Sequence, residues 1–91
     1  RKIFLSKSNT MKNFNKKKHY DLIFANILFG PLTSLAPRLK FISKPNSFII
    51  LSGLLRNQIT NIVNRYKIFG FNLKKKIIIN GWGTVIMRRQ F

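Results

Sequence analysis

The sequence Asp21-Leu22-Ile23-Phe24-Ala25-Asn26-Ile27-Leu28 decides how the rest of the chain is interpreted. Residues 22–25 form a short continuous apolar run, which is typical of a strand buried on both faces in a parallel sheet. Such a strand would end at Asn26, shortly before Gly30-Pro31. Because ligands in open α/β sheets bind beyond the carboxyl ends of the strands, the Asn26 side chain is a candidate site residue.

The residues that follow predict a helix, a turn and a second strand. One helical face carries the apolar residues Leu32, Leu35, Ala36, Leu39 and Ile42. Pro31 suits the first helical position, whereas Pro37 predicts a kink inside the helix. Lys44-Pro45-Asn46 predicts a turn. The apolar run from Ser47 to Gly53 then predicts a second buried strand.

The last third of the chain predicts a second helix and a hairpin. The apolar positions of that helix are Leu55, Ile59, Ile62, Val63, Tyr66 and Phe69. Gly70 fits a left-handed C-terminal cap. Asn80-Gly81 separates two β-prone runs, 71–79 and 82–88, and predicts a tight antiparallel hairpin. The order of elements therefore predicts an α/β fold, a parallel βαβα unit ended by an antiparallel hairpin.

Basic residues dominate the charge and occur in short clusters. The chain has 18 Lys and Arg against one carboxylate, Asp21, so its formal net charge is +17. This balance indicates a polyanion partner, or else the compositional drift of an A/T-rich genome, and the two readings weigh equally. We interpret Lys16–Lys18 as an exposed loop rather than a nucleic-acid site. Lys74–Lys76 fits an edge strand or a bulge, where lysines oppose aggregation.

The composition excludes several kinds of chemistry within these residues. The chain has no Cys, one His and one carboxylate. Disulfides, thiolate or histidine metal sites and paired carboxylates are therefore excluded, and we expect no metal. The longest uncharged stretch, 22–37, is shorter than the roughly 18 residues of a membrane span, and no secretory signal is evident. We therefore expect a cytoplasmic protein without a membrane partner.

Several short motifs resemble one protein family when they are taken together. These are Asp-Leu-Ile-Phe-Ala-Asn-Ile-Leu at 21–28, Gly-Pro-Leu at 30–32, Leu-Ala-Pro at 35–37, Leu-Ser-Gly-Leu-Leu at 51–55 with Gln58, Gly-Trp at 81–82 and Arg88-Arg89. Their order and spacing resemble the C-terminal part of the methyltransferase that modifies large-subunit ribosomal protein eleven. The resemblance covers about four-fifths of the chain, from His19 onward. It divides residues 1–91 into a basic connection, 1–18, which opens with a short strand at 2–5, and a family-like part, 19–91.

The resemblance implies a class I methyltransferase with a Rossmann-like sheet, S-adenosylmethionine (SAM) as cofactor and an amino group of a ribosomal protein as substrate. The family motif at the end of its fourth strand corresponds to Asn26, Ile27 and Leu28 here. Asn26 is thereby the expected catalytic residue, close to the incoming amine, and all three are expected to bind the cofactor. An amide oxygen that accepts a hydrogen bond from a neutral amine would aim the nitrogen lone pair at the methyl group.

The sequence also departs from the pattern of a complete enzyme. Class I enzymes use a Gly-rich loop and an acidic residue that holds the ribose, and the 91 residues contain neither. We therefore expect a C-terminal fragment of one methyltransferase domain that is inactive alone, with one edge of the 21–26 strand exposed because the family's first strand is absent. The alternative is a small basic RNA- or ribosome-binding protein that uses Lys16–Lys18, Lys74–Lys76 and Arg88-Arg89, and weak, non-specific RNA contact is expected in either case. A small α/β domain without activity is the third reading.

Overall fold

The computed structural model describes residues 1–6 and 19–90 as one sheet with helices packed on it. The elements in chain order are β1 (Lys2–Ser6), β2 (Tyr20–Asn26), α1 (Phe29–Ile42), β3 (Ser43–Leu55), the 3-10 turn η1 (Arg56–Gln58), α2 (Ile59–Ile68), β4 (Phe71–Ile79) and β5 (Trp82–Arg89). The run Lys16–Lys18 lies outside the described residues. Neither described helix is long and apolar enough to cross a membrane.

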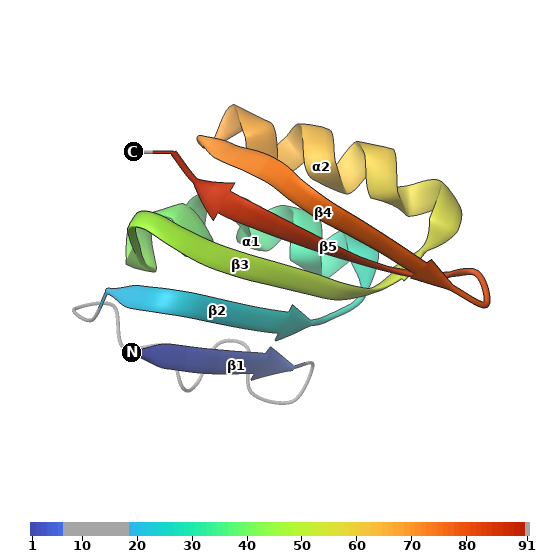
Figure 1. Ribbon diagram of the computed structural model, residues 1–91, viewed down its shortest axis with the longest axis horizontal. Coiled ribbons are helices and arrows are strands. Elements are labelled where there is room, and N and C mark those ends of the chain that lie inside the picture. Colours follow the sequence, from blue (N-terminus) through green and yellow to red (C-terminus); the bar gives the residue numbers. More distant parts are fainter. Residues whose placement is uncertain (7–18, 91) are drawn as a thin grey trace.

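The strands form a five-stranded mixed sheet in the order β1-β2-β3-β5-β4 (Figure 1). β1, β2 and β3 are parallel, and β5 and β4 run antiparallel to them. Parallel strands need a long connection, and α1 supplies the connection from β2 to β3. The predicted α/β order, a βαβα unit followed by an antiparallel hairpin, is confirmed.

The short strand predicted at the N-terminus is confirmed as β1, and it corrects one expectation. We expected one edge of the 21–26 strand to be exposed. Instead β1 pairs with β2 along its length, from Lys2 opposite Leu22 to Ser6 opposite Asn26. The apolar residues of β1 make this pairing favourable, since Leu5 is buried beside Ala25. β1 itself becomes the edge strand of the described sheet.

Helix α1 buries the five residues that its spacing predicts: Leu32, Leu35, Ala36, Leu39 and Ile42. It begins at Phe29, earlier than the predicted start at Pro31, so the proline lies within the first turn rather than at its first position. A proline is tolerated there because the N–H groups of the first turn have no partner within the helix. The helix continues through Pro37.

Two side chains of α2 bond to the carbonyls that precede Pro37. Pro37 has no N–H, so the Thr33 carbonyl lacks its usual backbone donor four residues later. Arg65 Nε donates to the Thr33 carbonyl oxygen at 3.1 Å, and the Tyr66 hydroxyl donates to the Leu32 carbonyl oxygen at 2.7 Å. These bonds fix α2 against α1 where the proline weakens the helix.

β3 is longer than predicted and corrects the turn at Lys44-Pro45-Asn46. Those residues lie inside β3, with Asn46 at a φ of 66°. The pairing with β2 shifts register here, since Tyr20 pairs with Ser43 but Leu22 pairs with Phe48. The turn-forming residues therefore produce a bulge within the strand rather than its boundary.

The start of the second helix was predicted too early. Leu55 ends β3 and is 42% exposed, so it is not part of the helix's apolar face. Its N–H donates to Gln58 Oε1 at 2.9 Å within the turn that precedes α2. The other end of the helix agrees with the prediction, because Gly70 has a φ of 88° and its N–H donates to the Lys67 carbonyl oxygen at 3.1 Å.

The C-terminal hairpin and its basic cluster are both confirmed. Asn80 and Gly81 have φ values of 52° and 80°, the positive values that the tight hairpin turns of type I′ require. β4 is the other edge strand, and its register with β5 shifts between Leu73 and Lys75. Lys74 therefore lies at a bulge, and Lys74–Lys76 are exposed along the edge.

Both helices cover the same face of the sheet (Figure 1). Side chains alternate along the strands, so that Ile23, Ala25, Ile49 and Leu51 are buried under the helices. The opposite face carries aromatic residues with substantial exposure, including Phe4 at 64% and Phe48 at 40%. The core of the described residues therefore lies in one layer between the sheet and the two helices.

Candidate active site

Asn26 lies at the carboxyl end of β2, where the sequence predicts it. It pairs with Ser52 of β3, so the ends of these two parallel strands lie side by side. Its side chain is exposed, and no hydrogen bond to its carboxamide is found in the described part of the chain. The amide is therefore available to a ligand.

Gly53 gives the Asn26 side chain its place. A Cβ atom built on Gly53 would lie 2.7 Å from Asn26 Oδ1, closer than real Cβ contacts allow. Gly53 also has a φ of 81°, which side chains other than glycine rarely adopt. The register between β3 and β5 shifts between Leu51 and Leu54, so this glycine lies in a bulge at the strand's end. A bulge beside a site commonly redirects a side chain.

A hollow with a volume of about 320 Å³ lies at this end of the sheet. Its lining residues are Asn26, Ile27, Leu28, Gly53 and Trp82. The three predicted site residues therefore meet at one place. They differ in exposure, since Ile27 is 4% exposed and Leu28 is 58% exposed.

Trp82 forms the wall opposite the β2 end and comes from the start of β5. It pairs with Leu55, and 56% of its surface is exposed. The N–H of Arg56 donates to the Gly81 carbonyl oxygen at 3.0 Å, which ties the hairpin turn to the end of β3. The exposed Trp82 side chain therefore forms one side of the hollow. Sequence reasoning missed Trp82 and Gly53 as site residues, although both belong to the quoted motifs.

Asp21 lies at the other end of β2 from Asn26. Its carboxylate contacts the Arg1 amino group at 2.6 Å and Lys44 Nζ at 3.5 Å. The hydrogen bond from the Arg1 amino group is the main cause that lowers the pKa of Asp21 below its ordinary value. Asp21 thus serves an ion pair away from the hollow. No cluster of three His, Cys, Asp or Glu residues occurs in ranges 1–6 and 19–90.

Comparison with solved structures identifies the class of fold. The M1.HpyAVI–SAM complex matches with a TM-score of 0.71 and 11% identity over 97% of this chain and 56% of its own. A methyltransferase from Pyrococcus furiosus matches with a TM-score of 0.66 and 16% identity over 82% of this chain and 43% of its own. At these identities the likeness concerns the fold alone, which is the Rossmann-like fold of methyltransferases.

Sequence comparison identifies the family within that class. The profile of the family described as "Ribosomal protein L11 methyltransferase (PrmA)" matches residues 2–90. Ribosomal protein L11 methyltransferases of Hydrogenovibrio crunogenus and Caulobacter sp. are 40% and 41% identical over 70 residues, which is 77% of this chain and 24% of each relative. The chain belongs to the ribosomal protein L11 methyltransferase family.

A crystal structure of a ribosomal protein L11 methylase supports the same family assignment. The ribosomal protein L11 methylase of Lactobacillus delbrueckii subsp. bulgaricus matches with a TM-score of 0.77 and 27% identity, over 82% of this chain and 39% of its own. The chain spans about a quarter of the length of the curated relatives it matches.

Proposed function

We propose that these residues form the substrate end of the catalytic domain of a SAM-dependent enzyme that methylates amino groups of ribosomal protein L11. The family membership supports the reaction and the substrate. The observation that carries the proposal for this chain is the placement of Asn26 over Gly53, at the mouth of the hollow that Trp82 bounds. A cytoplasmic location remains a prediction that accompanies this substrate.

Asn26 is proposed as the catalytic residue that positions the amine. Its Oδ1 would accept a hydrogen bond from a neutral amine, which fixes the direction of the nitrogen lone pair. With its lone pair directed in this way, the amine would be ready to accept the methyl group that the bound cofactor supplies, with its proton released to solvent. Because such a transfer depends on alignment of the reacting atoms, one well-placed acceptor has a large effect on its rate.

The residues present fit one part of the cofactor. SAM, when bound, supplies a sulfonium methyl group that is ready for transfer. Asn26, Ile27 and Leu28 would contact it from the end of β2, and the buried Ile27 would help to exclude water from the hollow. The carboxylate that holds a ribose is not among these residues, since Asp21 lies at the far end of β2. The remaining contacts must therefore come from outside the 91 residues, and we expect the chain alone not to bind SAM tightly.

The RNA- or ribosome-binding alternative is favoured by a different part of the surface, the end of the sheet where Lys74, Arg88 and Arg89 line one hollow. The exposed lysines Lys74–Lys76 lie on the edge strand β4, and Arg88 and Arg89 lie at the end of β5. The hollow that Lys74, Arg88 and Arg89 line shares no lining residue with the hollow at Asn26, so RNA contact there does not compete with the proposed methyl transfer. The two proposals require separate tests.

A chimera tests the proposed reaction. Residues 19–90 would replace the matching segment of the Lactobacillus delbrueckii methylase, and transfer of labelled methyl groups from SAM to purified L11 would be measured. We expect activity from the chimera and none from the 91-residue chain alone. A chimera that is folded by circular dichroism and binds SAM, yet transfers no methyl group to L11, would contradict the proposal.

A further inference from the structure

Two adjoining hollows lie at the end of the sheet opposite Asn26. The larger hollow, of about 370 Å³, has Pro37, Phe41 and Pro45 in its lining together with Lys40 and Arg89. The smaller hollow, of about 120 Å³, has Lys74, Arg88 and again Arg89. Arg89 lines both, so the two hollows are neighbours. They form around the bulge of β3 and the end of β5, whereas Asn26 belongs to the last pair at the other end of β2.

The smaller hollow is suited to an anion. Its lining residues are three cations and three side chains that carry an amide: Lys74, Arg88, Arg89, Asn46, Asn72 and Gln90. Its volume corresponds to about four water molecules, which is room for one oxyanion group. Lys74 is exposed at the bulge of β4, so its side chain can move toward a bound anion.

Arg88 is held in place although no acceptor satisfies it. Its guanidinium carbon lies 5.5 Å from the centre of the Phe48 ring, within the range of a cation–π contact. Its Nε atom is buried and has no hydrogen-bond partner within residues 1–6 and 19–90. The Phe48 ring therefore orients the Arg88 guanidinium without neutralising it.

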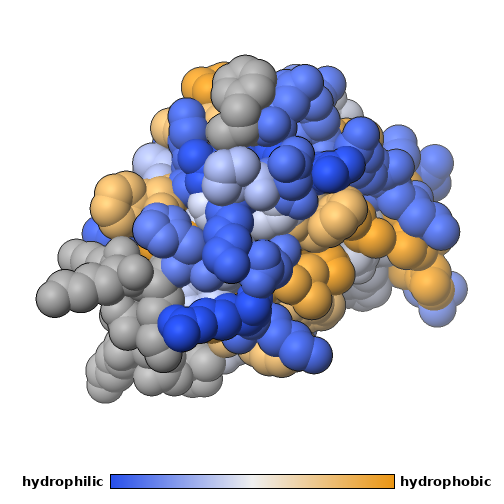
Figure 2. Space-filling model, turned by 60° about the vertical axis from the view of Figure 1, so that its left-hand side comes forward, coloured by the Kyte–Doolittle hydropathy of each residue, from blue (hydrophilic) through white to orange (hydrophobic). Residues whose placement is uncertain are grey.

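The one acidic side chain of the sequence is engaged outside this cluster. Asp21 is the only acidic side chain in the sequence, and it is engaged by the Arg1 amino group and Lys44. Figure 2 turns this end of the molecule toward the viewer, and hydrophilic residues dominate the described surface there. Like charges at short range repel one another, so an external anion that enters the hollow relieves this repulsion.

The larger hollow is lined by an aromatic ring and two prolines, in addition to cations. Phe41 is 66% exposed, and the hollow places it with two prolines beside the cations Lys40 and Arg89. A flat aromatic side chain with cations on its border is the arrangement on which nucleobases of single strands stack. An acidic peptide would use the cations of the smaller hollow but would leave this flat apolar wall unused.

We propose that the two hollows bind single-stranded RNA, with one nucleobase against Phe41 and an adjoining phosphate at Lys74 and Arg88. The alternation of a flat wall and a cationic hollow follows the alternation of base and phosphate along a strand. Arg89 lies between the two and donates from Nη1 to the Ser43 carbonyl oxygen, which anchors it to the bulge of β3. This inference does not depend on the proposed methyl transfer.

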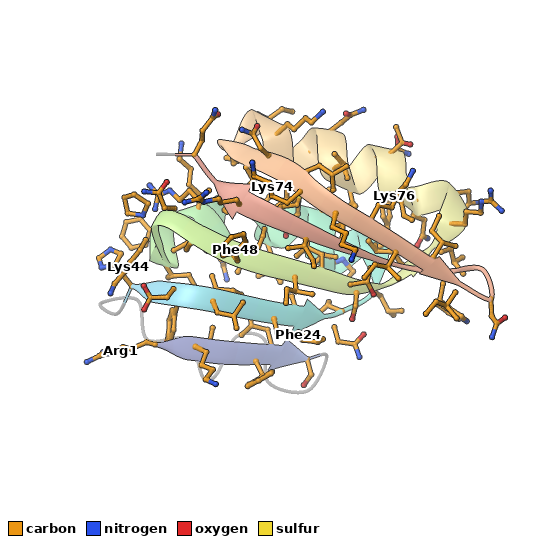
Figure 3. All side chains as sticks on the ribbon, viewed as in Figure 1. Arg1, Phe24, Lys44, Phe48, Lys74 and Lys76 are labelled. Atoms are coloured by element: carbon orange, nitrogen blue, oxygen red, sulfur yellow. The ribbon has the colours of Figure 1, made fainter. Side chains whose placement is uncertain are left out.

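Fluorescence anisotropy with a labelled single-stranded RNA oligomer tests the phosphate part. The variants are Lys74→Gln and Arg88→Gln, and Lys76→Gln is the matched control. Lys76 lies on the same strand but farther along it, away from Lys44, Phe48 and Lys74 (Figure 3). We expect Lys74→Gln to reduce the slope of log K against log salt concentration by about 0.7, the value for one phosphate contact, and Lys76→Gln to leave it unchanged.

Equal weakening by Lys74→Gln and Lys76→Gln would overturn the proposal, because it would indicate diffuse attraction to a charged surface. Lys74 is exposed, so its variant carries the test even if Arg88→Gln disturbs folding.

The base part is tested with Phe41→Ala and an oligomer that lacks bases. We expect Phe41→Ala to weaken binding of the normal oligomer and to leave binding of the abasic oligomer unchanged. If inorganic phosphate displaces the RNA and Phe41→Ala has no effect on either oligomer, the site binds a phosphate group alone and the RNA assignment is wrong. Tighter binding of an acidic peptide than of RNA would also overturn it.

Discussion

Gly53 is the residue on which the position of the Asn26 carboxamide depends. We predict that Gly53→Ala destabilises the fold by about 1–2 kcal/mol from its positive φ, with a further cost from the contact to Asn26 Oδ1. Gly70→Ala is the matched control, because Gly70 has a similar φ of 88° and no atom within 4 Å of its built Cβ. Urea unfolding measures both variants. Equal costs would show that the Asn26 side chain moves away freely.

The Tyr66 hydroxyl makes the free energy of unfolding depend on pH in the alkaline range. Burial raises the pKa of Tyr66 well above its ordinary value of 10.0, because the ionised phenol would be desolvated, while the nearby Arg65 opposes the shift. The folded state thus keeps the proton that the unfolded state loses. The Tyr66 contribution to stability is present below pH 10 and is lost as the pH rises above it.

Comparison with Tyr66→Phe isolates this effect, since the lysines titrate in both proteins. Loss of the hydrogen bond to the Leu32 carbonyl should cost Tyr66→Phe about 1 kcal/mol at neutral pH. This difference should shrink by about 1 kcal/mol between pH 10 and pH 11. Urea midpoints at the two pH values measure it. A difference that stays constant would mean that the buried phenol does not govern the alkaline transition.

The sequence predicts Asn26 as a site residue but not its neighbours in the hollow. Asn26 is predictable because it ends an apolar run, and the end of a parallel strand is where ligands bind. Gly53 and Trp82 join it only through pairing between strands, since Ser52 lies beside Asn26 and Leu55 beside Trp82. The Ser52-Gly53 end of the second strand is the signal in the sequence that could have indicated Gly53.

The contact between α1 and α2 compensates for Pro37. We predict that Arg65→Met costs about 1–2 kcal/mol, because the Thr33 carbonyl then has no donor. In a Pro37→Ala background a backbone N–H is available to Thr33, and the cost of Arg65→Met should be smaller. Lys67→Met, on an exposed position of the same helix, should change stability by less than about 0.5 kcal/mol.

A double-mutant cycle measured by urea unfolding gives the coupling between Arg65 and Pro37. The stacking of Arg65 on Phe69, at 4.9 Å, is present in both backgrounds and cancels. Zero coupling would show that Arg65 stabilises α2 by that contact alone.

Strands and helices were predictable where one periodicity acted alone. The buried residues of α1 follow the helical spacing, and Asn80-Gly81 forms the expected hairpin turn. The predictions were wrong where turn-forming or helix-like residues are part of a strand whose pairing continues. Lys44-Pro45-Asn46 has turn chemistry, but hydrogen bonding to β2 resumes beyond it, so tertiary pairing makes it a bulge. Leu55 fits the helical spacing, yet it pairs with Trp82.

The molecule as a whole separates two candidate activities to opposite ends of one sheet. Asn26 lies at the carboxyl end of β2, and Trp82 of β5 lies beside the carboxyl end of β3. Lys74, Arg88 and Phe41 lie around the two hollows at the other end. The net charge of +17 alone did not distinguish RNA binding from compositional drift. Only some of the cations lie around the hollows, so variants of those cations can be compared with variants of the others to distinguish the two readings. The pairing of β1 beside β2 was not predictable, because the spacing of residues does not tell which edge a separate strand will join.

Asn26 is the residue proposed to align the substrate amine for methyl transfer, and its truncation in an active enzyme probes that role. Asn26→Ala in the chimera with the Lactobacillus delbrueckii methylase should lower kcat for L11 methylation by about 10²-fold or more. The Kd for SAM should change much less, because the lost contact acts on the reacting amine. An Asn26→Ala chimera with kcat within about twofold of the unmodified chimera would contradict the claim.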